Sequence, residues 1–579
     1  RRAIDLLRAR PALVNARGAA GTTPLMEAAL YGDARLLKTL LELGGDPNRR
    51  NDRGSTALLW AVDDAAKVRL LLDAGADPNA GTDFGQAALL QAAGGPLPVV
   101  KLLVARGAEV TQPALNVAAR DNPEVLRLLL ARLPDKGDAA MTALRTGCTA
   151  CFAQFPASAQ LTRGLLMLLP VAGAGQERAL SIALERQADV NARDAKRRTP
   201  LMMAAISEVA PPTLVADLIG RGADVHATSG EGLNALDYAM RLGRPPLIEA
   251  FVAAGARPTT QPAPARATTA PAADARSAIL RSVPMLQKSS QVFYDKGGCV
   301  SCHHNLLGIV TTRTLHARGL PFDTALEARE IKTLVDDMAT SRDQALQGIV
   351  VPGGLYTTTG YILMSLDTAG HAPDASTDAL VRLLRRSQMR DGSWVSPVRP
   401  PSESSVMTAT ALALRGLRRY GDARDRGDRV AAARALAWLR ATRPTNNNED
   451  RTFRLLGLVW GEARASEIQA AMNDLLATQR TDGGWAQLEY RDSDAYATGQ
   501  ALVALHDAGV AVDSPAYLRG LRYLLDTQLA DGSWWVRTRS LFTQHYFESG
   551  FPHGRDQFIS AAATHWAVQA LAWSVPPGS

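Results

Sequence analysis

The stretch Thr-Pro-Leu-Met-Glu-Ala-Ala at residues 23–29 decides the fold of the first half of the chain, and it returns as Thr-Pro-Leu-Met-Met-Ala-Ala at residues 199–205. Proline is tolerated in the first turn of a helix because the amide there needs no partner. Each stretch therefore predicts the start of a short helix.

A second short segment repeats along the same half of the chain. Its copies begin at Gly44, Gly75, Gly107, Gln187 and Gly222, and within the regular parts neighbouring copies lie 31 to 35 residues apart. Each follows an apolar helix such as residues 34–41, whose leucines fall on one face. Glycine supplies the left-handed residue that ends a helix. The period predicts stacked helical repeats.

These segments resemble the ankyrin family in period and in the Thr-Pro-Leu-x-x-Ala helix start. The resemblance covers roughly residues 1–258 and weakens between about 135 and 180. It implies a solenoid whose concave surface binds a protein partner, because a single repeat cannot bury its own apolar face. We predict an ankyrin-repeat domain over residues 1–256, without an active site. The chain begins inside a repeat, so we expect an upstream segment, which would contain any signal peptide.

Cys148 and Cys151 fall in the weak part of the array, three residues apart. The spacing permits a disulfide or no bond at all, and we favour two inert, unbonded cysteines.

Composition limits the classes of partner. Apolar residues make up 46% of the 579 residues and charged residues 21%, as in soluble globular proteins. The net charge of +7 is small for this length and no block of Lys and Arg stands out, which argues against a nucleic-acid partner. No stretch of about 20 uncharged apolar residues exists, so no transmembrane segment is predicted. Residues 257–276 are rich in Pro, Ala and Thr and predict a semi-extended linker.

Three loops in the second half keep Gln and Trp six residues apart, at residues 388–394, 479–485 and 528–534. In each loop Gln ends an apolar helix, Asp-Gly makes the turn, and Trp closes over the turn as an apolar cap with one donor. A helix of small residues follows each loop, which allows close helix packing.

These loops resemble the QW repeats of the squalene–hopene cyclase superfamily. The resemblance spans about residues 277–575 and implies an α/α toroid, in which QW repeats tie outer helix ends to neighbouring loops. We therefore predict an all-α chain, with the toroid over residues 277–579. This scaffold hosts cyclases, protein prenyltransferases and non-catalytic binding domains, so the fold does not give the function.

Cys299-Val300-Ser301-Cys302-His303 is a C-x-x-C-H sequence, the attachment motif of cytochrome c-type haem. The motif implies thioether bonds from Cys299 and Cys302 to the porphyrin and His303 as the iron ligand. A disulfide or redox pair, or half of a zinc site, are the alternatives. Zinc needs four donors and no second cluster of matching spacing appears, while redox pairs usually lie near a strand–helix unit.

The second axial ligand is left open by the sequence. The candidates are Met338, Met364, His316, His371 and His553. Haem attachment takes place outside the cytoplasm, so the motif predicts a periplasmic or otherwise extracytoplasmic protein.

Candidate acids lie further along the chain. In triterpene cyclases the proton donor belongs to a D-x-D-D motif, and here Asp492-Ser493-Asp494-Ala495 is the nearest match. The resemblance places Asp494 at the acid position, with Asp492 as its upstream partner, while Ala495 replaces an Asp that takes part in its activation. Asp556 lies in a polar loop that we expect either at the mouth of the toroid or paired to an arginine.

The sequence thus supports three hypotheses. The first is an ankyrin array that docks a partner, joined to a toroid with covalent haem for electron transfer or redox sensing. The second is a non-catalytic interaction scaffold with a Cys299–Cys302 disulfide. The third is a terpenoid cyclase that uses Asp494 as its acid.

Overall fold

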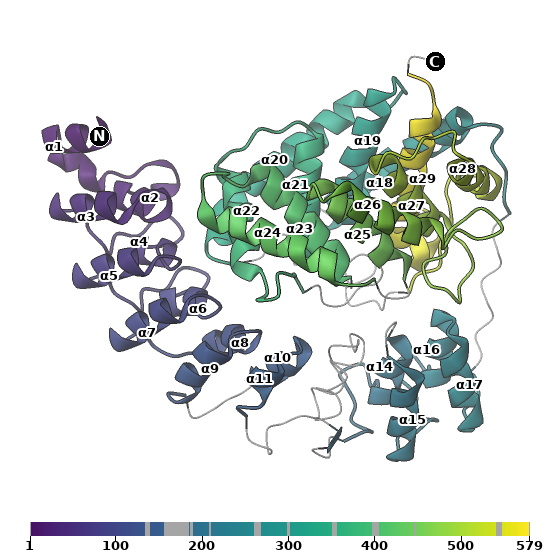
Figure 1. The fold of residues 1–579 in the computed structure, drawn as a ribbon, viewed down its shortest axis with the longest axis horizontal. Coiled ribbons are helices and arrows are strands. Elements are labelled where there is room, and N and C mark those ends of the chain that lie inside the picture. The colour runs from purple at the N-terminus through teal and green to yellow at the C-terminus, as the bar shows by residue number, and fades with distance from the viewer. Residues whose placement is uncertain are drawn as a thin grey trace. The chain divides into compact units, whose positions relative to one another are not determined.

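The computed structural model describes residues 2–133, 139–155, 184–185, 189–207, 210–259, 268–297, 302–349, 356–395, 405–444, 447–539 and 547–577. The chain divides into two compact units, Arg1–Gly232 with Leu346–Ile349, and Leu233–Ala345 with Val350–Ser579. The described residues form helices and two isolated β-bridges, without a strand (Figure 1), so the all-α prediction is confirmed. None of the described helices combines the length and apolar character needed to cross a membrane.

Short helices fill the first part of the chain. Their bounds are α1 (Arg2–Ala9), η1 (Pro11–Asn15), η2 (Ala19–Gly21), α2 (Pro24–Tyr31), α3 (Ala34–Glu42), α4 (Ala57–Trp60), α5 (Ala65–Asp73), α6 (Ala88–Ala92), α7 (Leu97–Ala105), α8 (Gln112–Ala119), α9 (Pro123–Leu130), α10 (Ala139–Arg145), α11 (Thr149–Phe152), α14 (Pro200–Ile206), α15 (Pro212–Gly220), α16 (Ala235–Leu242) and α17 (Pro245–Ala253). The threonines before Pro24 and Pro200 cap their helices, since Thr23 accepts a hydrogen bond from the amide of Met26 at 3.3 Å.

Asparagine side chains join consecutive repeats. Asn48 donates from Nδ2 to the Gly75 carbonyl at 2.9 Å and accepts from the Asp77 amide at 2.7 Å. Asn15 and Asn79 make the same pair of bonds to the repeats that follow them. In these repeats the turn of each repeat is therefore fixed by the asparagine of the repeat before it.

The cysteines of the first unit are bonded to each other. Cys148 and Cys151 form a disulfide across the start of α11. The interpretation of these residues as unbonded is therefore wrong, because the helical turn brings side chains three residues apart onto the same side.

The second unit contains a closed ring of helices. The inner helices are α19 (Leu307–Ala317), α21 (Tyr356–Thr368), α23 (Val406–Tyr420), α25 (Asn448–Trp460), α27 (Ala495–Asp507) and α29 (Gln557–Ser574). The outer helices are α18 (Ala275–Gly297), α20 (Thr324–Leu346), α22 (Ala375–Ser387), α24 (Arg426–Ala441), α26 (Ala465–Leu476) and α28 (Pro515–Thr527). Each inner helix packs against the next, and α29 packs against α19, which closes the ring as in an α/α toroid.

Small residues bring the inner helices close together. A Cβ atom on Gly499 of α27 would lie 2.6 Å from the backbone of Trp566 in α29, so no larger residue fits there. The inner helices are buried on nearly all sides, whereas the outer ones keep one exposed face. The helices of small residues predicted after each QW loop, α23, α27 and α29, therefore belong to the inner ring.

The QW loops clamp outer helices to one another. Gln388, Gln479 and Gln528 each donate to a glycine carbonyl of their own turn and to a carbonyl of the next outer helix, Ala431, Ala516 and Ala278 respectively, at 2.8 to 3.1 Å. Each Trp is almost fully buried and donates from its indole to a carbonyl of the preceding outer helix. Each Trp amide donates to a threonine of the following inner helix, Thr410, Thr498 or Thr564.

The end of the predicted linker is hydrogen-bonded to the third QW loop and to the helix before it. The amides of Ala270 and Ala272 donate to the carbonyls of Gln528 and Leu525 at 2.7 and 3.0 Å. The predicted domain limits, residues 1–256, 257–276 and 277–579, stay predictions.

Candidate functional site

The C-x-x-C-H motif lies at the entrance to the first inner helix. Cys299 falls outside the described residues, as do the side chains of Cys302 and His303. The backbone of Cys302 and His303 begins a π-helical turn, η4 (Cys302–Leu306), that leads directly into α19. The thioether and ligand roles of the three residues stay predictions.

The next residue, His304, is part of the packed core. It is fully buried, its Nε2 lies 3.1 Å from the Ser549 hydroxyl, and its ring stacks on Phe293 with centroids 4.8 Å apart. Phe551 and Phe558 meet the same imidazole edge-on.

A cavity of about 230 Å³ lies beside this turn, between α18, α19 and α20. Its polar lining includes Tyr294 and Asp295 of α18, Asn305 of the turn, and Arg329 and Glu330 of α20. Leu306, Ile309 and Leu334 supply apolar walls. The residues that directly follow the motif thus form one wall of a mixed apolar and polar cavity.

Glu330 is the most strongly perturbed group of this cavity. Burial raises the pKa of its carboxyl to about 7, and the negative charges of Glu327 and Asp323 add to the shift. A hydrogen bond from Ser290 and the positive charge of Arg329 act in the opposite direction. Glu330 is therefore close to half-protonated at neutral pH.

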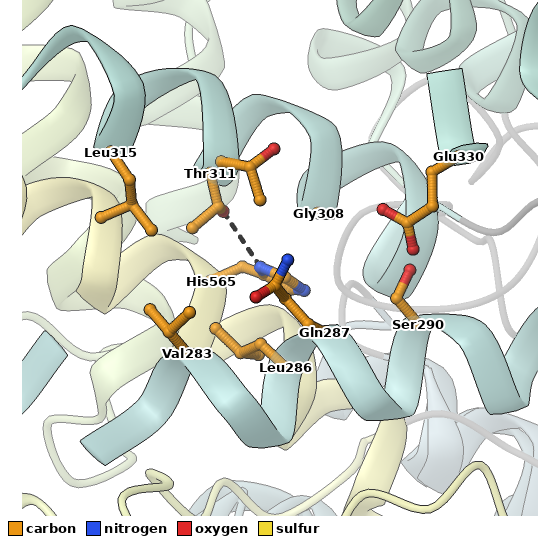
Figure 2. A pocket seen from close by; sticks show the side chains of 10 residues that line it. Val283, Leu286, Gln287, Ser290, Gly308, Thr311, Leu315, Glu330 and His565 are labelled. Carbon is orange, nitrogen blue, oxygen red and sulfur yellow. Dashed lines mark hydrogen bonds between the residues drawn. The ribbon is translucent and has the colours of Figure 1, made fainter. Parts of the chain in front are cut away.

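Glu330 also lines a second, smaller cavity, with room for about one water molecule (Figure 2). His565 of α29 lies on its far side, with Nδ1 3.0 Å from the hydroxyl of Thr311. The Asn305 amide donates to the carbonyl and hydroxyl of Ser290 at 2.9 and 3.0 Å, and so ties the turn after the motif to α18.

The candidates for a second axial ligand lie elsewhere. Met338 and Met364 are buried in α20 and α21, and His316 packs against Phe322. His371 pairs with Asp374 at 3.1 Å, and His553 lies 2.7 Å from the Ser533 hydroxyl. None of the five is among the described residues that line the cavity beside the motif.

A second cluster of polar side chains lies at the N-termini of inner helices. Asp494 caps α27 by accepting from the Ala497 amide at 2.9 Å, and Gln487 donates to its other oxygen at 2.7 Å. Gln487 in turn accepts from the buried Arg539 at 2.7 Å. Burial raises the pKa of Asp494 above its ordinary range, although these hydrogen bonds and Arg539 oppose the shift. Asp492, two residues before it, has an exposed side chain.

Glu449 is a member of this group that the sequence analysis missed. It is 3% exposed, and its carboxylate accepts from Thr408 of α23 at 2.9 Å and from Tyr496 of α27 at 3.0 Å. Burial raises its pKa to about 7, against the lowering effect of these donors and Arg539. The available signal was an acidic pair, Glu449 and Asp450, at the start of an inner helix.

Asp556 has a local role. It accepts from the Trp535 indole and the Thr538 amide, both at 2.9 Å, just before α29. These two bonds, rather than the arginine pair that the sequence suggested, hold the chain that follows the third QW loop. Among the described residues no cluster of three or more His, Cys, Asp or Glu side chains suits a metal ion.

The two halves of the chain are similar to known proteins to different extents. Residues 6–83 and 25–114 match the family of ankyrin repeats in three copies. The crystal structure of the human ASB11 ankyrin repeat domain aligns with 42% of this chain and all of its own, at 22% identity and a TM-score of 0.26. The ankyrin array indicates a function in protein–protein interaction.

The chain is also similar to a curated enzyme over a short stretch. A segment of 110 residues is 36% identical to squalene–hopene cyclase of Bradyrhizobium diazoefficiens. The match covers 16% of this chain and 16% of the cyclase, so the chain spans a small part of the relative's length.

Proposed function

We propose that this chain is an extracytoplasmic redox protein, in which the ankyrin array docks a protein partner and the toroid carries a covalent c-type haem. The supporting observation is the position of the C-x-x-C-H motif, whose last two residues start the turn that walls the cavity of about 230 Å³. Cys299 and Cys302 would form the thioether bonds and His303 would be the axial ligand. When bound, the haem supplies one-electron chemistry, for transfer to a redox partner or for redox sensing.

The chemistry of the cavity fits such a group. Leu306, Ile309 and Leu334 offer apolar contacts to a porphyrin face, and Arg329 offers a charge partner for a propionate. Sites that enclose drug-sized ligands measure about 300–1,000 Å³. The cavity of about 230 Å³ is smaller than this range, so it would hold only part of such a group.

The other residues hold the motif in place. Asn305 ties the turn to α18, and the buried His304 anchors it against Phe293 and Ser549. Both contacts hold the turn that follows the motif against α18 and the segment at Ser549.

The test is expression with export and haem-maturation machinery, followed by the intact mass and the spectrum of the pyridine-treated protein. We expect the mass of one haem and a covalent haem band. Cys299→Ser with Cys302→Ser should lose both, whereas the matched pair Cys148→Ser with Cys151→Ser should keep them. A wild-type chain without haem refutes the proposal, and a Cys299–Cys302 disulfide in that chain would favour the interaction scaffold.

A second candidate function is acid-initiated terpenoid cyclisation. The observations in its favour are the half-buried position and raised pKa of Asp494 and the similarity of 110 residues to a squalene–hopene cyclase. Protonation of an alkene needs a carboxyl that is protonated near its working pH. Incubation with a polyprenoid alkene should then give cyclic product that Asp494→Asn abolishes and Asp513→Asn, at an exposed position before α28, retains. Equal product from wild type and Asp494→Asn would exclude this role.

A further inference from the structure

One carboxyl oxygen in the cavity between α18, α19 and α20 has no donor. Glu330 of α20 lines this cavity of about 230 Å³, and its Oε1 atom is buried without a hydrogen-bond partner among the described residues. A buried acceptor that has lost its water and gained no donor is destabilised, most of all when it carries a charge. A ligand that donates a hydrogen bond to Oε1 would therefore stabilise the carboxylate and be held by it.

The walls of the cavity limit the size and shape of such a ligand. Leu306 and Ile309 come from the turn and from α19, and Leu326 and Leu334 come from α20. An apolar cavity of about 150 Å³ is large enough for a benzene molecule. The cavity of about 230 Å³ therefore has room for one ring with a short side chain.

The charges around the cavity favour a cation. Glu330 and Asp295 both line it. Among the described lining residues Arg329 is the one Lys or Arg, and it is exposed. Burial raises the pKa of the Glu330 carboxyl to about 7, and the negative charges of Glu327 and Asp323 oppose the positive charge of Arg329 there. The described lining thus offers Oε1 no buried cation, and a positively charged ligand would supply one.

We propose that this cavity binds a small organic cation, whose ammonium group donates to Glu330 and whose single apolar ring packs against the leucine and isoleucine walls. The ligand class follows from the unpaired acceptor, the room for one ring and the acidic lining together. The inference goes beyond the proposed function and does not rest on it. A porphyrin edge would use the same apolar walls, so haem and this ligand would compete for the cavity.

The test is a titration of the full chain, expressed without haem-maturation machinery, with benzylamine, which carries one ring and an ammonium group at neutral pH. Benzyl alcohol and benzoate have nearly the same shape but are neutral and anionic, so they are the matched control ligands. Saturation-transfer NMR on the ligand measures binding. We expect saturable binding of benzylamine and affinities at least about tenfold lower for the other two, because only the ammonium brings both a donor and a positive charge.

Two variants test whether the ligand lies in this cavity. Glu330→Gln keeps the shape of the side chain and removes its charge, so it should weaken benzylamine binding by about 10- to 100-fold. Thr333→Phe fills part of the cavity and should abolish binding. Asp336→Asn should bind as the wild type does, because Asp336 lies on the same helix with a side chain that is 61% exposed and does not line the cavity. Urea unfolding of each variant establishes that it is folded.

A wild-type chain without a saturable response to benzylamine overturns this inference, as does equal affinity for benzyl alcohol or benzoate. Wild-type affinity in either Glu330→Gln or Thr333→Phe also overturns it, since the ammonium or the ring would then lie elsewhere. Haem attachment is measured by the intact mass and depends on none of these results, so the proposed function stands or fails separately.

Discussion

The third clamp offers the sharpest test of what holds the toroid closed. Gln528 is fully buried, and its amide donates to the Ala278 carbonyl at 2.9 Å, the Gly532 carbonyl at 3.1 Å and the Ser282 hydroxyl at 3.1 Å. Ala278 and Ser282 belong to α18, the first outer helix, whereas Gln528 follows α28, the last one. The substitution Gln528→Ala therefore removes these side-chain bonds across the seam of the ring and leaves the bond from Ser282 to the Gly532 carbonyl.

The magnitude follows from the bonds that are lost. A typical intramolecular hydrogen bond contributes about 0.5–1.5 kcal/mol net, and a buried group left without a partner costs about 1–3 kcal/mol. We expect Gln528→Ala to lower the free energy of unfolding of the toroid by about 2–4 kcal/mol. Gln388 and Gln479 occupy the same place in partly exposed clamps, so their alanine variants should lose less.

Tryptophan fluorescence during urea unfolding is a suitable assay. Eight of the nine tryptophans lie after residue 275, with Trp60 the exception, so the signal reports mainly on the toroid. The ankyrin array contributes little to it, because Trp60 is its one tryptophan. An unfolding midpoint of Gln528→Ala equal to that of the wild type, or a larger loss in Gln388→Ala, would refute the assignment of the seam to this clamp.

Three further predictions concern other parts of the chain. Gly483→Ala should destabilise the toroid by about 1–3 kcal/mol in the same assay, because Gly483 has φ of +86° and a Cβ there would lie 2.5 Å from the Arg519 carbonyl. Asn48→Ala should lower the thermal midpoint of the ankyrin array by the equivalent of about 1–2 kcal/mol, through loss of both inter-repeat bonds, whereas Asn116→Ala, in the interior of α8, should change it less. Glu449 has a pKa raised from 4.5 to about 7, so the folded state holds a proton that the unfolded chain has lost between these values, and stability should fall by up to about 3 kcal/mol as pH rises from 4.5 to 7. Glu449→Gln should remove that pH dependence in urea unfolding at pH 5 and pH 8, and an unchanged dependence would assign it to another group.

Local sequence patterns predicted the fold correctly wherever the pattern determines a structure within one helix or one loop. Thr23 with Pro24 predicts a helix start because both act within one turn, and Gln528 with Trp534 predicts a clamp because Asp531 and Gly532 form the turn between them. The threonines that accept from the clamp tryptophans were within the predicted small-residue helices, but their role depends on a contact with another segment. Sequence alone gives no sign of that contact.

The candidate sites were harder to predict for the same reason. Glu449 stands beside Thr408 and Tyr496, which are 41 and 47 residues away along the chain, so only the closed ring brings the three together. Glu330 owes its raised pKa to burial between three helices, which no local pattern reports. Asp494 was found only through resemblance to a cyclase motif, and its cap on α27 was not foreseen. The prediction that Cys148 and Cys151 are unbonded was wrong, because their spacing alone is compatible with a disulfide and with two free thiols.

The position of Glu449 shows which electrostatic effect prevails at the start of the inner ring. Helix N-termini carry a partial positive charge that favours carboxylates, by about 0.3–1 kcal/mol at exposed sites and up to about 2 kcal/mol when partly buried. Glu449 is the second residue of α25, and the positive charge of Arg539 acts in the same direction, yet its pKa rises to about 7. The cost of burying the charge therefore exceeds both effects, by about 3 kcal/mol for a shift from 4.5. Because Thr408 and Tyr496 hold the carboxyl from two neighbouring helices, the ring cannot relieve this cost by turning the side chain to solvent without breaking both bonds. The toroid thus keeps a protonatable group in its interior through the same close helix packing that makes it stable.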